Sequence, residues 1–182
     1  MKQIRTRLQS RQQGVALFIS LVLLLVLTIA GVSAVQTTTL EERMARNSHD
    51  SMMAFQSAES ALRQAETWME TNVNAVAIFT DAGTNGLWTA APFDETDRWM
   101  NAAVWSGAQS VVVPVDVPDV AQQPRYIIEW LATVERTEGG AMLSSSYQSV
   151  MDRIEVFRIT ARGVGGSTNS QVILQSTYGM IL

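Results

Sequence analysis

Few side chains in this sequence have the types and spacing that catalysis requires. The 182 residues contain no cysteine, which removes thiol catalysis, disulfides and cysteine-based metal sites. The one histidine, His49, lies among polar helix residues, and nothing in the sequence supports a nucleophile or acid held beside it for catalysis, so an exposed helix position is the better interpretation. Two acidic stretches, 93–99 (FDETDRW) and 116–120 (DVPDV), offer the oxygen ligands that Ca²⁺ prefers, but solvated loop charge is the better interpretation. We therefore predict no enzymatic activity, no cofactor and no metal site.

The sequence indicates more clearly where a protease would act on the chain itself. A basic leader, 1–14, ends in Arg11, Gln12, Gln13 and Gly14, and an apolar run begins at once with Val15. The peptide bond after Gly14 is a candidate cleavage site, because glycine suits an extended backbone lying close to a protease. A second candidate bond follows Ala34, where the small residues of 32–36 (VSAVQ) fit ordinary signal peptidase.

The segment that would position these bonds is a membrane-spanning helix. Residues 15–35 contain no charge, and as a helix they would span about 31 Å, close to the hydrocarbon thickness of a bilayer. Because the leader is basic and Glu41 and Glu42 follow the apolar run, the positive-inside rule places the leader in the cytoplasm and the body outside it. Three interpretations stand at this point: a cleaved secretory signal, a plain anchor, or an anchor kept after the leader is removed.

The helix is expected to continue beyond the membrane. Residues 36–72 contain no proline or glycine and show apolar residues at helical spacing, which predicts an amphipathic half. We infer one helix from about Leu17 to Asn72, with Phe55, Leu62 and Met69 packed on the chain's own sheet. Glu59 is expected to pair with Arg63 on the opposite side. The full apolar stripe is Leu40, Met44, Phe55, Ala58, Leu62, Ala65 and Met69.

The remaining chain predicts an irregular region, 73–124, followed by an antiparallel sheet, 125–182. Residues 81–86 (DAGTNG) have turn chemistry, and prolines demote 111–120 to an edge strand or a loop. Trp88, Trp99 and Trp105 are expected to pin this region to the core, with Trp68 and Trp130 as neighbours. Strands are expected at 125–135, 152–163 and 170–179, joined by the connectors 138–149 and 163–169. The fold class is therefore α+β.

Alternation within the expected strands predicts which side chains share a face. In the first strand, one face takes Tyr126, Ile128, Trp130, Ala132 and Val134, and the opposite face takes Glu129, Thr133 and Glu135. In the second strand, one face takes Phe157, Ile159 and Ala161, and the other takes Arg158, Thr160 and Arg162. A half-buried sheet needs cover, which the amphipathic half of the helix can supply.

This layout resembles a type IV pilin, and three segments resemble the minor pilins of the PilX type. They are 11–47 (RQQGVALFISLVLLLVLTIAGVSAVQTTTLEERMARN), 54–66 (AFQSAESALRQAE), and the terminal 157–178, which begins FRITARGVGG and ends VILQSTY. The resemblance covers the first 70 residues and the last 30 or so. It implies that a prepilin peptidase recognises Arg11 and Gly14 and cuts after Gly14. Val15 would then be the N-methylated first residue of the mature chain.

Two positions depart from the pilin pattern. The residue before the glycine is usually basic in major pilins and is Gln13 here, so Arg11 would supply that charge. The fifth residue of the processed chain is usually a glutamate, whose partner is the N-terminal amine of the neighbouring subunit nearer the tip; here it is Ile19. A subunit with no neighbour on that side needs no such carboxylate. Ile19 is thus interpreted as the marker of a subunit at the tip, a feature shared with tip pseudopilins of type II secretion. The alternative is that Ile19 is simply a residue that faces lipid.

The expected function is that of a minor pilin that helps to initiate type IV pilus assembly in a tip-located priming complex, with adhesion and twitching motility as outcomes. Its expected partners are other minor pilins, the major pilin, a tip adhesin, the prepilin peptidase and inner-membrane lipid. The net charge of −4 argues against nucleic acid as a partner. The alternatives are a type II secretion tip pseudopilin and a soluble periplasmic binding protein released after Ala34.

Overall fold

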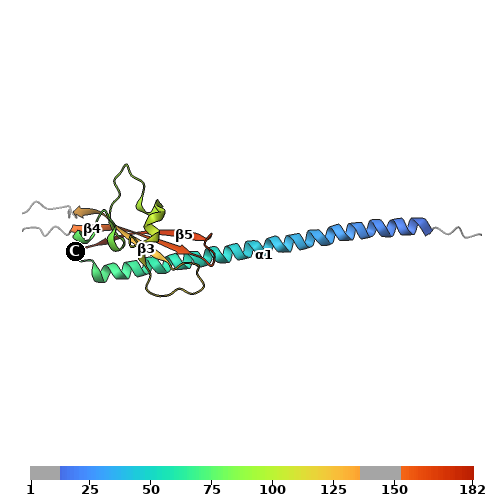
Figure 1. Cartoon of the computed structure of the whole chain (residues 1–182), viewed down its shortest axis with the longest axis horizontal. Helices are drawn as coiled ribbons and strands as arrows, with labels where there is room; N and C mark the ends of the chain where they lie inside the picture. The colour runs from blue at the N-terminus through green and yellow to red at the C-terminus, as the bar shows by residue number, and fades with distance from the viewer. Residues whose placement is uncertain (1–12, 136–152) are drawn as a thin grey trace, which may run out of the picture. The chain divides into compact units, whose positions relative to one another are not determined.

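A computed structural model describes residues 13–135 and 153–182 of the chain, shown in Figure 1. The chain divides into two compact units, Met1–Arg46 and Asn47–Leu182, and each is treated by itself below. Arg11 and the expected connector 138–149 lie outside the described residues.

A single long helix, α1, runs from Gln13 to Asn72 and contributes to both units. The predicted helix is confirmed, although it begins four residues earlier than the expected Leu17. At its C-terminal end, the Val73 amide donates to the Met69 carbonyl oxygen (3.0 Å) and the Asn72 side-chain amide donates to the Trp68 carbonyl oxygen (2.8 Å). These bonds satisfy carbonyl groups that the helix end would otherwise leave unpaired.

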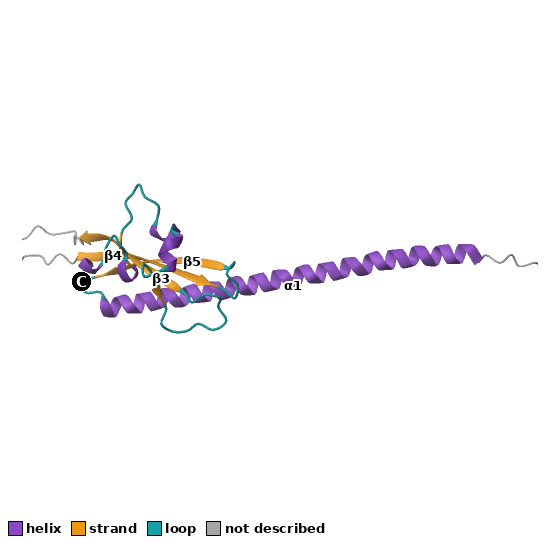
Figure 2. Cartoon of the chain, viewed as in Figure 1, coloured by secondary structure: helices purple, strands orange, loops and turns teal. Residues whose placement is uncertain are grey.

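The second unit contains a five-stranded sheet, drawn as orange arrows in Figure 2. Its main strands are β3 (Arg125–Glu135), β4 (Arg153–Val164) and β5 (Gln171–Met180), paired in an antiparallel meander as predicted. Two short strands lie along the other edge of β3: β1 (Leu87–Thr89) is parallel to it, and β2 (Val111–Val112) is antiparallel. The parallel β1 was not predicted, and it makes the sheet mixed.

The 73–124 region also forms four short 3₁₀ helices. They are η1 (Val76–Ile78), η2 (Thr84–Gly86), η3 (Arg98–Met100) and η4 (Ala102–Ser106). The predicted turn at 81–86 is confirmed, because Gly83, Asn85 and Gly86 all have positive φ angles (64°, 56° and 73°) in and beside η2. Glycine and asparagine adopt this left-handed conformation more readily than other residues.

The second half of α1 packs on one face of the sheet through a row of small side chains. Ala54, Ala58, Ala61, Ala65 and Met69 are fully buried, and they meet a sheet face that includes Phe157, Ile159 and Ala161. Gly163 on β4 lies so close that a Cβ there would come within 3.0 Å of the backbone of Ala54 and Ala58. Small residues on both elements therefore set a short distance between helix and sheet.

The expectation for Phe55 is wrong, although Met69 is buried and Leu62 packs against the core as predicted. The side chain of Phe55 is 47% exposed. It lies one position beyond Ala54, so the helix turns it away from the sheet by about 100°. Alanines line the contact between α1 and the sheet because their small side chains permit the close approach at Gly163.

A β-bulge changes the expected alternation in β3. Trp130 is the partner of Phe157, but the next pair along the ladder is Ala132 with Val156, which leaves Leu131 as an extra residue. As a result Thr133, expected on the face opposite Trp130, shares its face: the Trp130 Nε1 and Thr133 Oγ1 groups both donate to Glu155 Oε2, at 2.8 and 2.7 Å. Ala132 and Val134 are exposed rather than buried with Trp130.

The face of the sheet opposite α1 is covered by the 73–124 region through tryptophans. Trp88 and Trp105 are buried with Val104 and with Ile127 of β3, and Trp99 packs against them, as expected. The Trp88 and Trp105 indole N–H groups donate to the carbonyl oxygens of Gln109 (3.0 Å) and Trp99 (2.8 Å). The other two tryptophans, Trp68 and Trp130, were expected beside this cluster, but they are half-buried and pack against the core on the α1 side.

Candidate functional site

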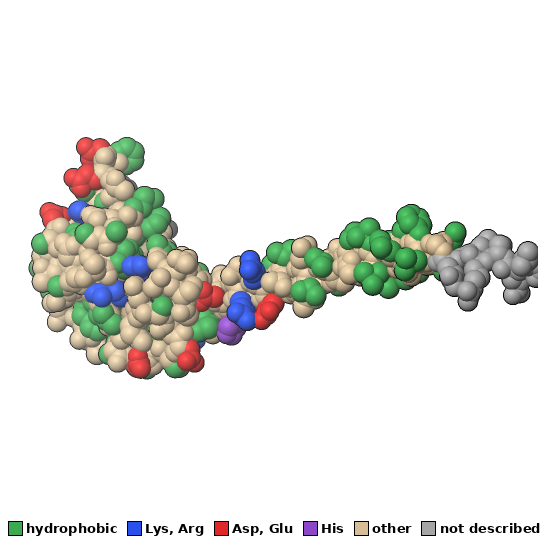
Figure 3. Space-filling view, turned by 45° about the vertical axis from the view of Figure 1, so that its right-hand side comes forward, with side chains coloured by type: hydrophobic (Ala, Val, Ile, Leu, Met, Phe, Trp, Pro, Cys, Tyr) green, Lys and Arg blue, Asp and Glu red, His purple; other side chains and the backbone are tan. Residues whose placement is uncertain are grey.

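The most exposed apolar surface in the described chain is the first half of α1. All residues from Val15 to Val35 are exposed, and Figure 3 shows green side chains along this part of the helix, followed by charged ones. An 18-residue window has a mean hydropathy of 3.0 and no buried residue. By length and composition, α1 is therefore able to cross a membrane. It is the one such helix among the described residues.

The hydroxyl groups in this apolar surface are satisfied by the helix itself. Ser20 Oγ donates to the Leu17 carbonyl oxygen (2.8 Å), and Thr28 Oγ1 donates to that of Leu25 (2.7 Å). Ser33 Oγ donates to the Ile29 carbonyl oxygen at 2.9 Å. These groups therefore need no outside partner when the segment is surrounded by lipid or by other apolar helices.

The predicted cleavage residues lie at the start of α1. Gly14 and Val15 are exposed in its first turn, and a Cβ on Gly14 would meet nothing within 4 Å. Ile19, one turn further, is 55% exposed and lies with Phe18, Val22 and Leu23 on an apolar surface of the helix. The structure thus places Val15 and Ile19 on one helix, and the described residues that share the surface of Ile19 are all apolar.

The first charges after the apolar run are solvated. Arg46 pairs with Glu42 across one turn of α1 at 2.5 Å, and both side chains are more than half exposed. The predicted pair of Glu59 and Arg63 is confirmed at 3.4 Å, on the exposed side of the second half of the helix. Pairs of this kind contribute only about 0.3–0.5 kcal/mol, so they mark polar surface rather than a binding site.

The acidic stretches of the sequence do not come together around a cation position. Among the described residues, no group of three or more His, Asp or Glu side chains is placed to hold a metal ion. Asp97 of the first stretch accepts from Arg158 at 3.4 Å, and Glu95 lies 3.8 Å from Arg98. His49 is exposed on α1, where it borders a hollow with Asp116 and Asp119.

Sequence reasoning missed a buried ion pair under the 73–124 region. Arg158 donates from Nε and Nη2 to the two carboxylate oxygens of Glu129, at 2.9 and 3.2 Å, and Glu129 is 0% exposed. The bond to Glu129 raises the pKa of Arg158 above its usual value, and the charge of Asp97 adds to the effect. The signal was available, because alternation had placed both residues on the same face and they are direct partners in the ladder.

Comparison with known protein families gives the chain its class. The model of the PilX N-terminal domain matches residues 13–63, and the model of the type IV pilus assembly protein PilX C-terminal domain matches residues 61–180. No curated protein and no solved structure matches the chain.

A long apolar N-terminal helix whose second half packs on a C-terminal sheet defines a pilin-like α+β protein. The two matches together span the described helix and sheet, so the chain belongs to the PilX family of type IV pilus assembly proteins. It is a minor pilin, and family membership implies that it interacts with other pilus components. The family is one of structural pilins and is not a known enzyme family.

Proposed function

We propose that this minor pilin helps to initiate type IV pilus assembly as a subunit at or near the tip of a priming complex. The observation that carries the proposal is Ile19, an apolar residue at the position where most pilins have a glutamate. The first half of α1 contains no charge between Val15 and Val35, so a subunit below the tip would lack the carboxylate that pairs with the amine of the neighbour above. A subunit with no neighbour above loses nothing by that lack.

In this proposal the chain acts first as a membrane anchor and then as a subunit of the fibre. The helix first anchors the subunit in the inner membrane, with the leader 1–14 in the cytoplasm and the body in the periplasm. A prepilin peptidase recognises the region of Arg11 and Gly14 and cuts before Val15, whose amine is then methylated. The helix afterwards packs among the helices of other minor pilins and the major pilin, with a tip adhesin as a further partner, in support of adhesion and twitching motility.

The intact mass of the processed chain tests the first stage. We expect a chain that begins at Val15 and carries one added methyl group. A chain that begins at Val35 would instead be the soluble product of ordinary signal peptidase, and a chain that begins at Met1 would be an unprocessed anchor. Either of these masses would refute prepilin processing. The family matches favour the pilus over type II secretion, and the neighbouring genes provide an independent check of that choice.

A pair of glutamate substitutions tests the tip position. In a tip subunit, Ile19→Glu would bury a carboxylate without a partner and should reduce piliation as strongly as Leu23→Glu, one helical turn further on. In a subunit below the tip, Ile19→Glu would find the amine of its neighbour and be tolerated, whereas Leu23→Glu would not. Ile19→Leu is the conservative control. Normal piliation and normal recovery of partner subunits with Ile19→Glu would refute the tip position.

A further inference from the structure

Two arginine side chains lie opposite each other on the sheet face that α1 does not cover. Arg125 of β3 is the direct ladder partner of Arg162 of β4. Four residues further along β3, Glu129 is the partner of Arg158, and that pair is joined by two hydrogen bonds. One face thus contains a pair of opposite charges and a pair of like charges, and like charges directly opposite each other destabilise a sheet.

The hydrogen bonds of these two arginines go to neutral acceptors. Arg125 donates from Nε to Ser110 Oγ at 2.9 Å, and from Nη2 to the carbonyl oxygens of Gly107 (2.5 Å) and Ser110 (3.2 Å). Arg162 donates from Nη2 to Gln171 Oε1 at 3.0 Å. In the part of the chain that the structure describes, neither guanidinium forms an ion pair. Burial, and then the charge of Arg162, lowers the pKa of Arg125 below its usual value.

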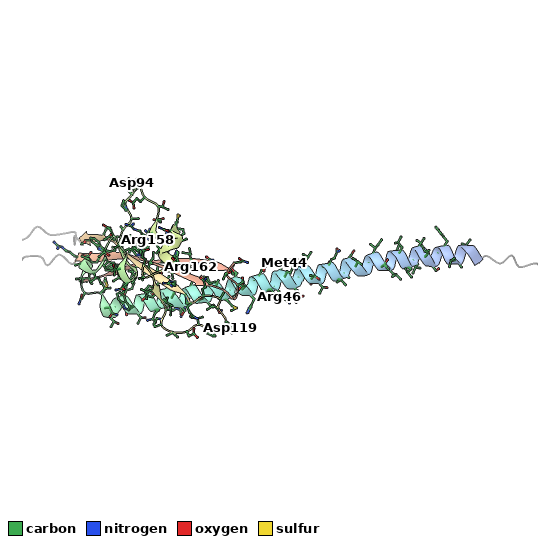
Figure 4. The ribbon with its side chains drawn as sticks, in the orientation of Figure 1. Met44, Arg46, Asp94, Asp119, Arg158 and Arg162 are labelled. Carbon is green, nitrogen blue, oxygen red and sulfur yellow. The ribbon has the colours of Figure 1, made fainter. Side chains whose placement is uncertain are left out.

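Both side chains line one hollow of about 540 Å³ between the sheet and the 102–123 segment. Its wall is apolar where Ala102, Trp105 and Val112 line it, and Gln122 supplies a polar group. The Arg162 guanidinium lies 5.9 Å from the centroid of the Trp105 ring, and Figure 4 labels Arg158 and Arg162 over the sheet strands. No carboxylate is among the described residues that line this hollow, although the chain as a whole has a net charge of −4.

We propose that this hollow binds a carboxylate group presented by another protein subunit, held between the guanidinium groups of Arg125 and Arg162. A planar carboxylate accepts two parallel hydrogen bonds from a guanidinium, which suits the flat fork of arginine. Its negative charge converts the repulsion between the two arginines into a shared attraction. The apolar wall at Trp105 and Val112 favours a carboxylate on a carbon chain over a hydrated inorganic anion. The source of the carboxylate, another protein subunit, rests on the proposed function in pilus assembly. The binding of a carboxylate in this hollow does not.

Thermal unfolding of the full-length protein in detergent tests the anion chemistry without any other pilus component. At constant ionic strength, N-acetylglutamate α-amide, whose one charge is its side-chain carboxylate, should raise the unfolding temperature by a few degrees in a saturable way. The neutral N-acetylglutamine α-amide should not. The rise should be absent in Arg162→Gln, reduced in Arg162→Lys and kept in the control Arg63→Gln, which removes an exposed arginine from α1. Equal effects of the two amino acids, a larger effect of inorganic phosphate, or an unchanged rise in Arg162→Gln would each overturn the proposal.

The same variants supply a readout that needs no ligand. Because Arg162→Gln removes a like charge, it should unfold at a higher temperature than the wild type when no carboxylate is added. A purely structural arginine would give a lower temperature, and that result would overturn the proposal. Arg162 is preferred to Arg125 for this test because Arg125 joins β3 to Gly107 and Ser110 through three hydrogen bonds.

A photocrosslinking amino acid at Gln122 tests the source of the carboxylate in cells. We expect an adduct with another pilin subunit that is present in the otherwise wild-type chain and lost when Arg162→Gln is added. An effect of N-acetylglutamate α-amide in detergent without such an adduct would overturn the subunit as the source. The detergent assay is independent of priming and of tip location, so its failure is distinguishable from failure of the proposed function.

Discussion

The close approach of α1 to β4 makes Gly163→Ala a sharp test of the packing between helix and sheet. An added Cβ would come within 3.0 Å of backbone atoms of Ala54 and Ala58, whereas ordinary contact begins at 3.4 Å. The atoms in the way are backbone, so no side chain can rotate to make room. The added Cβ would lie 2.2 Å from the Ala54 carbonyl oxygen, so the helix must move outward by about 1 Å along a contact that is otherwise fully buried.

The cost of that movement is estimated from packing energies. A gap of about 0.5–1 Å forfeits a quarter to a half of the dispersion energy of each contact that it opens. Overpacking a core typically costs about 1–3 kcal/mol, and a backbone clash belongs at the upper end of this range. We therefore expect Gly163→Ala to reduce the free energy of unfolding by about 3 kcal/mol. In a unit of this size, this loss lowers the unfolding temperature by about 10 °C.

The assay is thermal unfolding of the full-length protein in detergent, followed by near-ultraviolet circular dichroism of the buried tryptophans. The matched control is Gly107→Ala, because a Cβ at Gly107 would meet nothing within 4 Å and its φ of −139° suits any residue. If Gly163→Ala unfolds within a degree or two of both the wild type and Gly107→Ala, the helix is not held close to the sheet at this point and the reasoning is wrong.

Two further substitutions test the polar anchors of the second unit. Glu129→Gln leaves Arg158 with the more distant Asp97 as its one charged partner among the described residues, so the free energy of unfolding should fall by about 3 kcal/mol in a denaturant titration. An unchanged midpoint would contradict a structural role for the ion pair. Asp50 accepts bonds from the amide (3.1 Å) and the hydroxyl of Ser167, and chiefly the hydroxyl bond lowers its pKa below 3.8. A carboxyl group with a lowered folded pKa adds stability above its unfolded pKa and loses it as the pH falls through the folded value. The wild type should therefore unfold at a higher temperature than Asp50→Asn at about pH 6, with the difference shrinking toward about pH 2; a difference independent of pH would count against the assignment.

Much of the fold was predictable because its largest elements have strong periodic patterns. The long helix follows from an unbroken apolar run joined to an amphipathic stretch without proline or glycine, and the meander follows from three alternating strands with short or polar connectors. The pairing of Glu129 with Arg158 was also within reach, since each lay on the expected outer face. Local alternation is reliable where one backbone conformation continues without interruption.

The errors have two physical causes. The bulge at Leu131 depends on how β3 fits β4 and leaves no mark in the alternation of β3 alone, so Thr133 was placed on the wrong face. The stripe that included Phe55 counted apolar residues by spacing and ignored volume, whereas contact with Gly163 selects alanine. The like-charged pair of Arg125 and Arg162 emerges only from the ladder register, because the two residues are far apart in the sequence.

The hydroxyl hydrogen bonds along the first half of α1 affect the free energy of transferring this segment from one apolar medium to another. Ser20, Thr28 and Ser33 give their hydrogens to their own backbone, and no side chain between Val15 and Val35 is ionisable. Transfer from one oily medium to another therefore breaks no polar contact and requires neither proton uptake nor rehydration. For the side chains of this segment, the free-energy difference between the two media is then set by dispersion and shape, so the same helix suits both surroundings.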